Sequence, residues 1–186
     1  MPTHTLLMGL RASGKSTTAP DLASRLNLPH LDLDDATCAQ LGVENAGEAF
    51  RTLGEPAFRR AETQALQHAL EQKNPSIIAL GGGTPTAPGA ATLINHAAIS
   101  GNATAIYFRA SPATLAARIA AAPSHNRPSL TGTTPALETT RLHKQRDPLY
   151  RTLATHTINA DHLTPDQLTD RAATIINPQT PPPSHA

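Results

Sequence analysis

Short apolar runs alternate with longer stretches of helical periodicity along this chain. The apolar runs are typical of buried strands, and they predict strands at residues 4–8, 30–34, 76–80, 104–109 and 156–159. Apolar residues at helical spacing predict helices at residues 15–26 and 58–71. Ser111-Pro112 marks another helix start, because Ser can cap free amides and Pro is tolerated in a first turn. The alternation predicts an α/β fold whose parallel sheet is covered by helices on both faces.

Three segments break this pattern. Residues 121–135 hold three Pro and one Gly, and we expect them to form a mobile loop. Residues 178–186 are polar and rich in Pro, so we expect a disordered tail after a single domain at residues 1–177. Residues 146–150 contain Pro148, which we expect to interrupt a long helical stretch.

Composition excludes several classes of protein. The 186 residues are 39% hydrophobic and 3% aromatic without Trp, so Ala, Leu, Ile and Val must fill the core. The formal net charge of +1 gives no support to a nucleic-acid-coating protein or a polybasic membrane binder. The longest apolar runs are too short to cross a bilayer, and the N-terminus lacks a secretory signal, so we expect a cytoplasmic protein. The single cysteine, Cys38, excludes a disulfide framework and is expected to be buried.

A complete phosphate-loop motif follows the first predicted strand. Residues 9–16 read Gly-Leu-Arg-Ala-Ser-Gly-Lys-Ser, which matches G-x-x-x-x-G-K-[ST] between a strand and a helix. Backbone N–H groups and the helix N-terminus would cradle phosphates, Lys15 would reach the β- and γ-phosphates, and Ser16 would ligate Mg²⁺. The alternative is a glycine turn that begins a helix and binds nothing. The motif indicates a nucleoside triphosphate but does not choose among GTPases, ATPases and small-molecule kinases.

Two carboxylates follow the second predicted strand. Asp32 and Asp34 are two residues apart, so we expect them to share one side of an extended chain at the carboxyl edge of the sheet. One could hold magnesium through water, while the other could orient and deprotonate an attacking hydroxyl. The alternative is a solvated turn in which an Asp at position 34 or 35 caps a helix.

Arginines and glycines supply the remaining candidates. Arg59 and Glu62 are spaced to pair on one helix face, as part of a site or as a surface ion pair. The glycines at residues 81–83 either admit a ligand or another backbone closely, or form a plain tight turn. Arg127, in the predicted loop, and Arg146 are not diagnostic alone.

Taken in order, these motifs resemble the shikimate kinase family, within the nucleoside-monophosphate-kinase-like P-loop superfamily. The resemblance spans about residues 4–160. It rests on the phosphate loop, Asp32-Leu33-Asp34, Gly54-Glu55 with Phe58-Arg59-Arg60 and Glu62, Gly81-Gly82-Gly83, Arg127-Pro128 and Arg146-Asp147-Pro148-Leu149-Tyr150. The phosphate loop occurs in many enzyme families, whereas the whole series of motifs in this order is specific to this family.

The resemblance implies transfer of the ATP γ-phosphate to the 3-hydroxyl of shikimate, with Mg²⁺, by a three-layer α/β/α P-loop kinase fold. It implies a five-stranded parallel sheet in the order 2-3-1-4-5, a substrate-binding segment at about 33–62 and a mobile lid at about 120–135. A monomer is expected.

The resemblance also implies roles for individual residues. Those implied to bind shikimate are Asp34, Phe58, Arg59, Gly81, Gly82, Gly83 and Arg146. Those implied to bind ATP are Ala12, Ser13, Gly14, Lys15, Ser16, Thr17, Arg118 and Arg127. Ser16 and Asp32 are implied to serve the metal, and Asp34, Lys15 and Arg127 to be catalytic. The two arginines suit a carboxylate, because a planar guanidinium meets it with two parallel hydrogen bonds.

Some positions depart from the family pattern, and two other functions stay open. Ala12 stands where the family often has Gly, Pro20 falls inside the first helix, and Asp161-His162-Leu163 stands where the family often offers an Arg to adenine. One alternative is another P-loop kinase of gluconate or adenylate type. The other is a nucleotide-binding module that has lost catalysis and acts through a partner.

Overall fold

A five-stranded parallel sheet forms the centre of the computed structural model, which describes residues 3–121 and 134–178. The strand order is β2-β3-β1-β4-β5, as the family resemblance implied. The strands are β1 (His4–Met8), β2 (His30–Asp32), β3 (Ile77–Ala79), β4 (Ala103–Arg109) and β5 (His156–Asn159).

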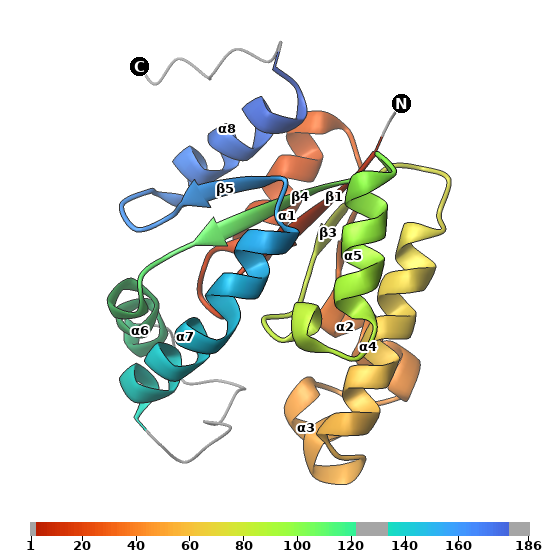
Figure 1. Ribbon diagram of the computed structural model, residues 1–186, viewed down its shortest axis with the longest axis vertical. Helices are drawn as coiled ribbons and strands as arrows, with labels where there is room; N and C mark the ends of the chain where they lie inside the picture. Colours follow the sequence, from red (N-terminus) through yellow and green to blue (C-terminus); the bar gives the residue numbers. More distant parts are fainter. Residues whose placement is uncertain (1–2, 122–133, 179–186) are drawn as a thin grey trace.

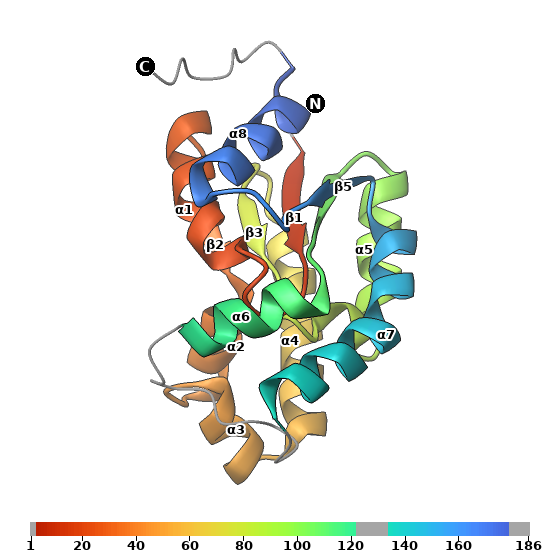
Figure 2. The same cartoon turned by 90° about the vertical axis from the view of Figure 1, so that its left-hand side faces the viewer.

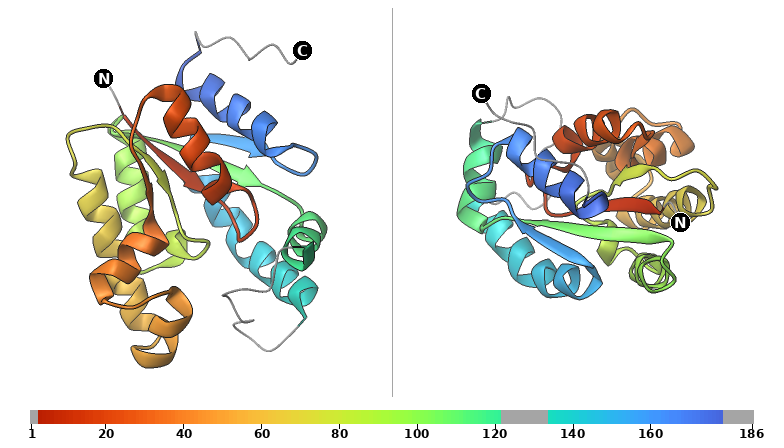
Figure 3. Two further views of the ribbon diagram at one scale, coloured as in Figure 1. Left: turned by 180° about the vertical axis from the view of Figure 1, so that it is seen from behind. Right: turned by 90° about the horizontal axis from the view of Figure 1, so that it is seen from above.

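Helices cover both faces of this sheet, so the predicted three-layer architecture is confirmed (Figures 1 and 3). One face carries α1 (Lys15–Leu26) and α8 (Pro165–Ile176), and the other carries α5 (Ala90–Ile99) and α7 (Pro135–Leu153). The remaining helices are α2 (Leu33–Leu41), α3 (Ala46–Thr52), α4 (Glu55–Leu70), the 3₁₀ turn η1 (Thr84–Thr86) and α6 (Pro112–Ala121). Helices α2 and α3, the start of α4 and helix α6 lie beyond the carboxyl ends of the strands (Figure 2), where ligands of such sheets bind. The rest of α4 runs beside α5, and its residues Leu66 and Ala69 belong to the main core (Figure 1).

Two hydrophobic clusters hold these layers together. The main core is mostly aliphatic and centres on the buried strands β1 and β4, and it also includes Tyr107, Phe108 and Tyr150. A smaller cluster of Cys38, Ala49 and Phe58 stabilises the α2–α4 segment. Cys38 is buried there, as expected for a small apolar residue.

The predicted strand at residues 30–34 is two residues too long. Strand β2 ends at Asp32, whose carboxylate Oδ1 accepts a hydrogen bond of 3.0 Å from the backbone N–H of Asp34. That contact satisfies a free amide of the first turn and begins helix α2 at Leu33. Asp32 and Asp34 therefore do not share one side of an extended chain, because Asp34 lies in the first turn of a helix.

The predicted interruption at Pro148 is also wrong. Helix α7 continues from Pro135 to Leu153 with Pro148 inside it. A proline removes one internal hydrogen bond, but Asp147 and Tyr150 on either side are buried, and their packing keeps the helix continuous. Helix α1 likewise runs through Pro20, which is exposed.

Most of the predicted lid lies outside the described residues. This includes Arg127, so its placement is not part of the structure. The predicted tail beyond residue 178 lies outside them as well. Within the described ranges, no helix is long and apolar enough to cross a membrane.

Candidate functional site

The phosphate loop joins β1 to α1 and is shaped by backbone conformations that favour glycine. Gly9 and Gly14 have φ angles of 156° and 107°. A Cβ on Gly9 would lie 2.8 Å from the carbonyl oxygen of Phe108, which no side chain tolerates. Gly14 is the N-cap of α1 and uses no side chain to cap it, so the free amides of the first turn stay available to an anion.

Ala12 adopts a left-handed conformation with φ 65°. Alanine pays roughly 1–2 kcal/mol for this backbone, whereas glycine adopts it without strain. The loop therefore keeps the shape that a glycine would give it, at a cost in stability.

The side chain of Lys15 is folded into this loop. Its Nζ donates to the carbonyl oxygens of Gly9 at 2.8 Å and Leu10 at 3.0 Å, and the residue is only 7% exposed. The carbonyl oxygens of Gly9 and Leu10 thus hold the Lys15 amino group next to the N-terminus of α1. The loop therefore concentrates positive potential where phosphates would sit.

Ser16 and Asp32 form a pair of oxygen donors beside the loop. The Ser16 Oγ donates to Asp32 Oδ2 at 2.9 Å, so the first turn of α1 and the end of β2 meet here. Mg²⁺ prefers such oxygen ligands, and commonly takes one or two from the protein and others from substrate phosphates. No cluster of three or more His, Cys, Asp or Glu residues suited to a metal occurs in the described part of the chain. The pair therefore fits a magnesium ion that is bound together with a nucleotide.

A pocket of about 400 Å³ opens above the loop. The loop, Asp32, Asp34 and Gly81-Gly82 line one side of it. Leu163, Pro165 and Leu168 form an apolar side with Arg118. Arg118 donates to the carbonyl oxygens of Ala12 at 3.3 Å and Ala160 at 2.7 Å, so it ties the loop to the segment after β5. The apolar side suits a flat base, and the loop side suits phosphates.

The three glycines after β3 each lie against a different part of the site. A Cβ on Gly81 would lie 2.2 Å from Asp34 Oδ1 and 2.6 Å from Glu62 Oε1. One on Gly82 would press on the backbone of the phosphate loop, 3.2 Å from the Arg11 nitrogen. One on Gly83 would meet the Arg59 guanidinium at 2.5 Å. The close approach expected of this segment is confirmed.

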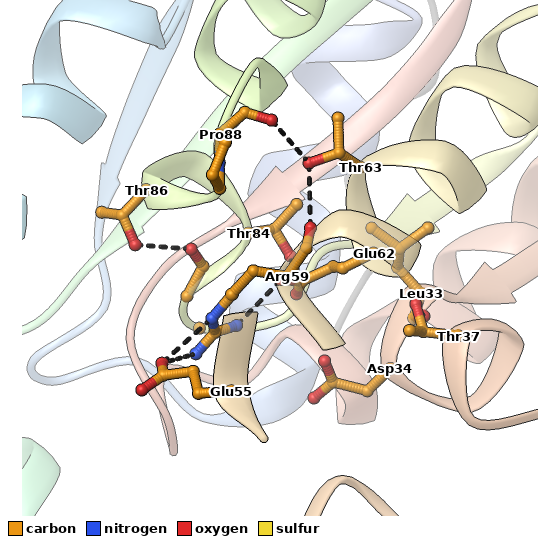
Figure 4. A network of polar contacts seen from close by, with 12 residues as sticks. Leu33, Asp34, Thr37, Glu55, Arg59, Glu62, Thr63, Thr84, Thr86 and Pro88 are labelled. Carbon is orange, nitrogen blue, oxygen red and sulfur yellow. Dashed lines mark hydrogen bonds and ion pairs between the residues drawn. The ribbon is translucent and has the colours of Figure 1, made fainter. Parts of the chain in front are cut away.

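Arg59 is held between two glutamates of its own helix (Figure 4). Its Nη1 donates to Glu62 at 2.8 Å, while its Nε and Nη2 reach Glu55 at 3.2 and 3.0 Å. The guanidinium also lies 5.5 and 5.7 Å from the ring centroids of Phe50 and Phe58. Phe58 is itself buried, so its ring is a fixed surface against which the Arg59 guanidinium packs.

Glu62 is fully buried, so its pair with Arg59 is not a surface ion pair. Its second oxygen accepts a hydrogen bond of 2.5 Å from the Thr84 hydroxyl. Burial raises the pKa of the Glu62 carboxyl above its ordinary value of 4.5, and the Arg59 charge limits the rise. The Asp34 carboxyl lies beside Glu62 at Gly81, in the same polar cluster (Figure 4).

Arg146 comes to the same segment from α7. Its Nη1 donates to the Gly82 carbonyl oxygen at 2.6 Å, and the Tyr150 hydroxyl donates to the same oxygen at 2.6 Å. Burial raises the pKa of Tyr150 to about 12, so this hydroxyl keeps its proton. Arg59 at Gly83 and Arg146 at Gly82 therefore approach one glycine segment from two helices.

Sequence reasoning missed several of these contacts. Glu55, Thr84 and Tyr150 hold or face predicted residues, and Leu163, Pro165 and Leu168 line the pocket. Glu55 precedes Arg59 by four residues, which is a pairing signal on a helix. The contact of Thr84 with Glu62 joins residues 22 apart in sequence, and local spacing gives no signal for it.

Comparisons with known proteins agree with this geometry. The family model for shikimate kinase matches residues 11–177. The chain belongs to the shikimate kinase family. A shikimate kinase of Rhodopirellula baltica is 35% identical over 169 residues, which cover 90% of this chain and 87% of the relative. A shikimate kinase of Enterococcus faecalis is 31% identical over 163 residues, covering 88% and 92%.

Solved structures of shikimate kinases share the fold. The enzyme from Acinetobacter baumannii, solved in complex with shikimate, superposes with a TM-score of 0.83 at 26% identity, covering 95% of this chain and 93% of that one. The enzyme from Bacteroides thetaiotaomicron gives 0.81 at 26% identity, covering 94% and 98%. A gluconokinase from Sinorhizobium meliloti, at 0.64 and 16% identity with coverage of 94% and 91%, shares the fold alone.

Proposed function

We propose that this protein is a shikimate kinase that transfers the γ-phosphate of ATP to the 3-hydroxyl of shikimate. The observation that carries the proposal is the approach of Arg59 and Arg146 to residues 82–83, which adjoin the phosphate loop. Two guanidinium groups at one glycine segment suit a small molecule with a single carboxylate. Shikimate is bound by the Acinetobacter baumannii relative, and it has this carboxylate together with hydroxyl groups.

The phosphate loop is the proposed ATP site. The backbone of residues 12–17 would hold the phosphates, and Lys15 would leave the carbonyls of Gly9 and Leu10 to bind the β- and γ-phosphates. Arg118 and the apolar side of the pocket would lie against adenine. Positioning and charge stabilisation are the main demands of phosphoryl transfer.

Asp34 is the proposed general base. Its carboxyl lies against Gly81, at the boundary between the glycine segment and the phosphate-loop pocket. As a bond forms between the shikimate O3 and the γ-phosphorus, the bond from phosphorus to the β,γ-bridging oxygen breaks. The O3 proton would pass to Asp34, and ADP would leave with the bridging oxygen.

Several finer assignments belong to the same proposal. Ser16 and Asp32 would hold Mg²⁺, which supplies charge neutralisation on the phosphates when bound. Arg127 would act from the lid. Phe58 and Gly81–Gly83 would complete the shikimate site. The proposal includes a single domain at residues 1–177 that acts as a cytoplasmic monomer.

Release of ADP tests this function. We expect turnover with Mg²⁺-ATP and shikimate, and at least 100-fold lower kcat/KM with gluconate or AMP in parallel reactions. A preference for gluconate or AMP would identify another P-loop kinase. Tight ATP binding with no turnover at any shikimate concentration would identify a module without catalysis.

A further inference from the structure

Asp147 forms a polar contact between α7 and β4 that has no part in the site described above. Its Oδ1 accepts a hydrogen bond of 3.0 Å from the Tyr107 hydroxyl and one of 2.7 Å from Arg109 Nε. Tyr107 and Arg109 are two apart on β4 and so lie on one side of the strand. One carboxylate oxygen therefore fastens the helix to the strand at two neighbouring positions.

This contact is charged, and it is buried on the side of Tyr107 and Asp147, whereas the Arg109 side chain is 41% exposed. Tyr107 is 1% exposed, so its hydroxyl depends on Asp147 as an acceptor. Burial favours the neutral acid, but the hydrogen bonds from Arg109 and Tyr107 outweigh it and lower the pKa of Asp147. The Tyr107 ring also meets the Tyr150 ring edge to face, with 5.3 Å between centroids.

The same turn of α7 carries the contacts with the glycine segment. Arg146 immediately precedes Asp147, and Tyr150 follows it by three residues. Both donate to the Gly82 carbonyl oxygen at 2.6 Å. This turn of α7 is thus held by β4 on one side and by Gly82 on the other. The two contacts together fix the orientation of α7 relative to the sheet.

Pro148 stands next to Asp147 and removes one internal hydrogen bond from this part of α7. Because proline has no N–H, the carbonyl of residue 144 loses its usual partner within the helix. The helix is therefore weakest internally in the turn that presents Arg146. The hydrogen bonds from Tyr107 and Arg109 to Asp147 support α7 from outside at this turn.

We propose that Asp147 is a positioning residue for shikimate, acting through Tyr107 and Arg109 to aim Arg146 and the Gly82 carbonyl. This inference rests on the proposed function, because it assumes that Arg146 binds the shikimate carboxylate. Asp147 lies outside the phosphate-loop pocket, so its influence should fall on shikimate and spare ATP.

Asp147→Ala tests the proposal through its two Michaelis constants. We expect the KM for shikimate to rise about 5- to 20-fold, because small displacements of an orienting group weaken binding strongly. The KM for ATP should stay within about twofold, and kcat within about threefold. Asp147→Asn keeps an acceptor for Tyr107 and Arg109, and should restore most of the shikimate KM. A merely structural role would lower the active fraction and leave both KM values unchanged.

Asp170→Ala is the matched control. It removes another Asp–Arg pair, between Arg25 of α1 and Asp170 of α8, and should leave the shikimate KM unchanged. If Asp147→Ala does not fold, Tyr107→Phe deletes one of the two hydrogen bonds and should raise the shikimate KM about two- to fourfold. Unchanged shikimate KM in the folded variants would overturn the proposal. Absence of shikimate turnover in the unmodified protein would instead overturn the proposed function.

Discussion

Ala12 has a backbone conformation that its side chain disfavours. Its φ of 65° is one that glycine adopts freely. We expect Ala12→Gly to raise the free energy of unfolding by about 0.5–1 kcal/mol, since relief of roughly 1–2 kcal/mol of strain exceeds the added entropy of the unfolded chain. Thermal unfolding should show a midpoint about 1–4 °C higher.

The control for this substitution is Ala117→Gly in the exposed face of α6. Its backbone is helical, so glycine should lower stability by about 0.5–1 kcal/mol. A fall in stability for both variants would show that the strain at Ala12 is negligible.

Lys15 is a residue that exchanges one set of oxygen partners for another. It holds two loop carbonyls in the structure, and in the proposed function it would hold phosphates. Lys15→Ala should lower kcat at least 100-fold, by removing the charge that positions the γ-phosphate. Shikimate binding, followed by calorimetry, should remain. Lys73→Ala changes an exposed lysine after α4 and should retain full activity. Near-normal kcat in Lys15→Ala would contradict the loop assignment.

Contacts within one helix could be predicted from the sequence, whereas other contacts of single residues could not. The Arg59–Glu62 pair followed from spacing on one helix. The geometry of Asp32 and Asp34 did not, because a capping hydrogen bond from the Asp34 amide turned the chain before the second carboxylate. Contacts between distant segments, such as Tyr150 with Gly82, depend on packing that local spacing does not encode.

Among the elements, α1 contains a proline that its position in the helix disfavours. Pro20 is exposed and follows the first turn, so its replacement disturbs no buried contact. Pro20→Ala should restore an N–H to the carbonyl of residue 16 and raise the free energy of unfolding by about 1–3 kcal/mol. Denaturant unfolding measures this change through the midpoint at constant slope.

Pro165→Ala provides the comparison, since Pro165 stands in the first turn of α8, where proline suits the helix. Pro165→Ala should not raise the free energy of unfolding. If Pro20→Ala did not raise it either, helix α1 would already accommodate Pro20 without a cost in stability.

The elements themselves were largely predictable because apolar periodicity records burial. Strand β5 and helix α1 have the predicted bounds. Strand β2 and helix α7 do not, for opposite reasons. A side-chain cap ended β2 early, and tertiary packing on β4 carried α7 through Pro148.

For the whole molecule, the fold brings the two proposed half-sites together from separate elements. The proposed ATP half-site comprises the phosphate loop, Arg118 and the start of α8. The proposed shikimate half-site comprises α4, the glycine segment and α7. The sheet order followed from the family resemblance, whereas local periodicity alone gave only an α/β class. Gly82 is the point of contact, since it touches the phosphate loop and Arg146.

Separate half-sites should respond separately to their ligands. Shikimate at 100 times its Kd should stabilise the protein by about 2.7 kcal/mol, which is a rise of about 5–10 °C in Tm for a chain of this size. Arg146→Ala should weaken shikimate binding by at least about 2 kcal/mol. At the same concentration, the rise in Tm that shikimate produces in this variant should therefore be no more than about 2–4 °C. The shift produced by ATP should be unchanged, because Arg146 contacts Gly82 and does not line the phosphate-loop pocket. Equal loss of both shifts in Arg146→Ala would mean that the variant disturbs the sheet edge as a whole, and the division into half-sites would be wrong.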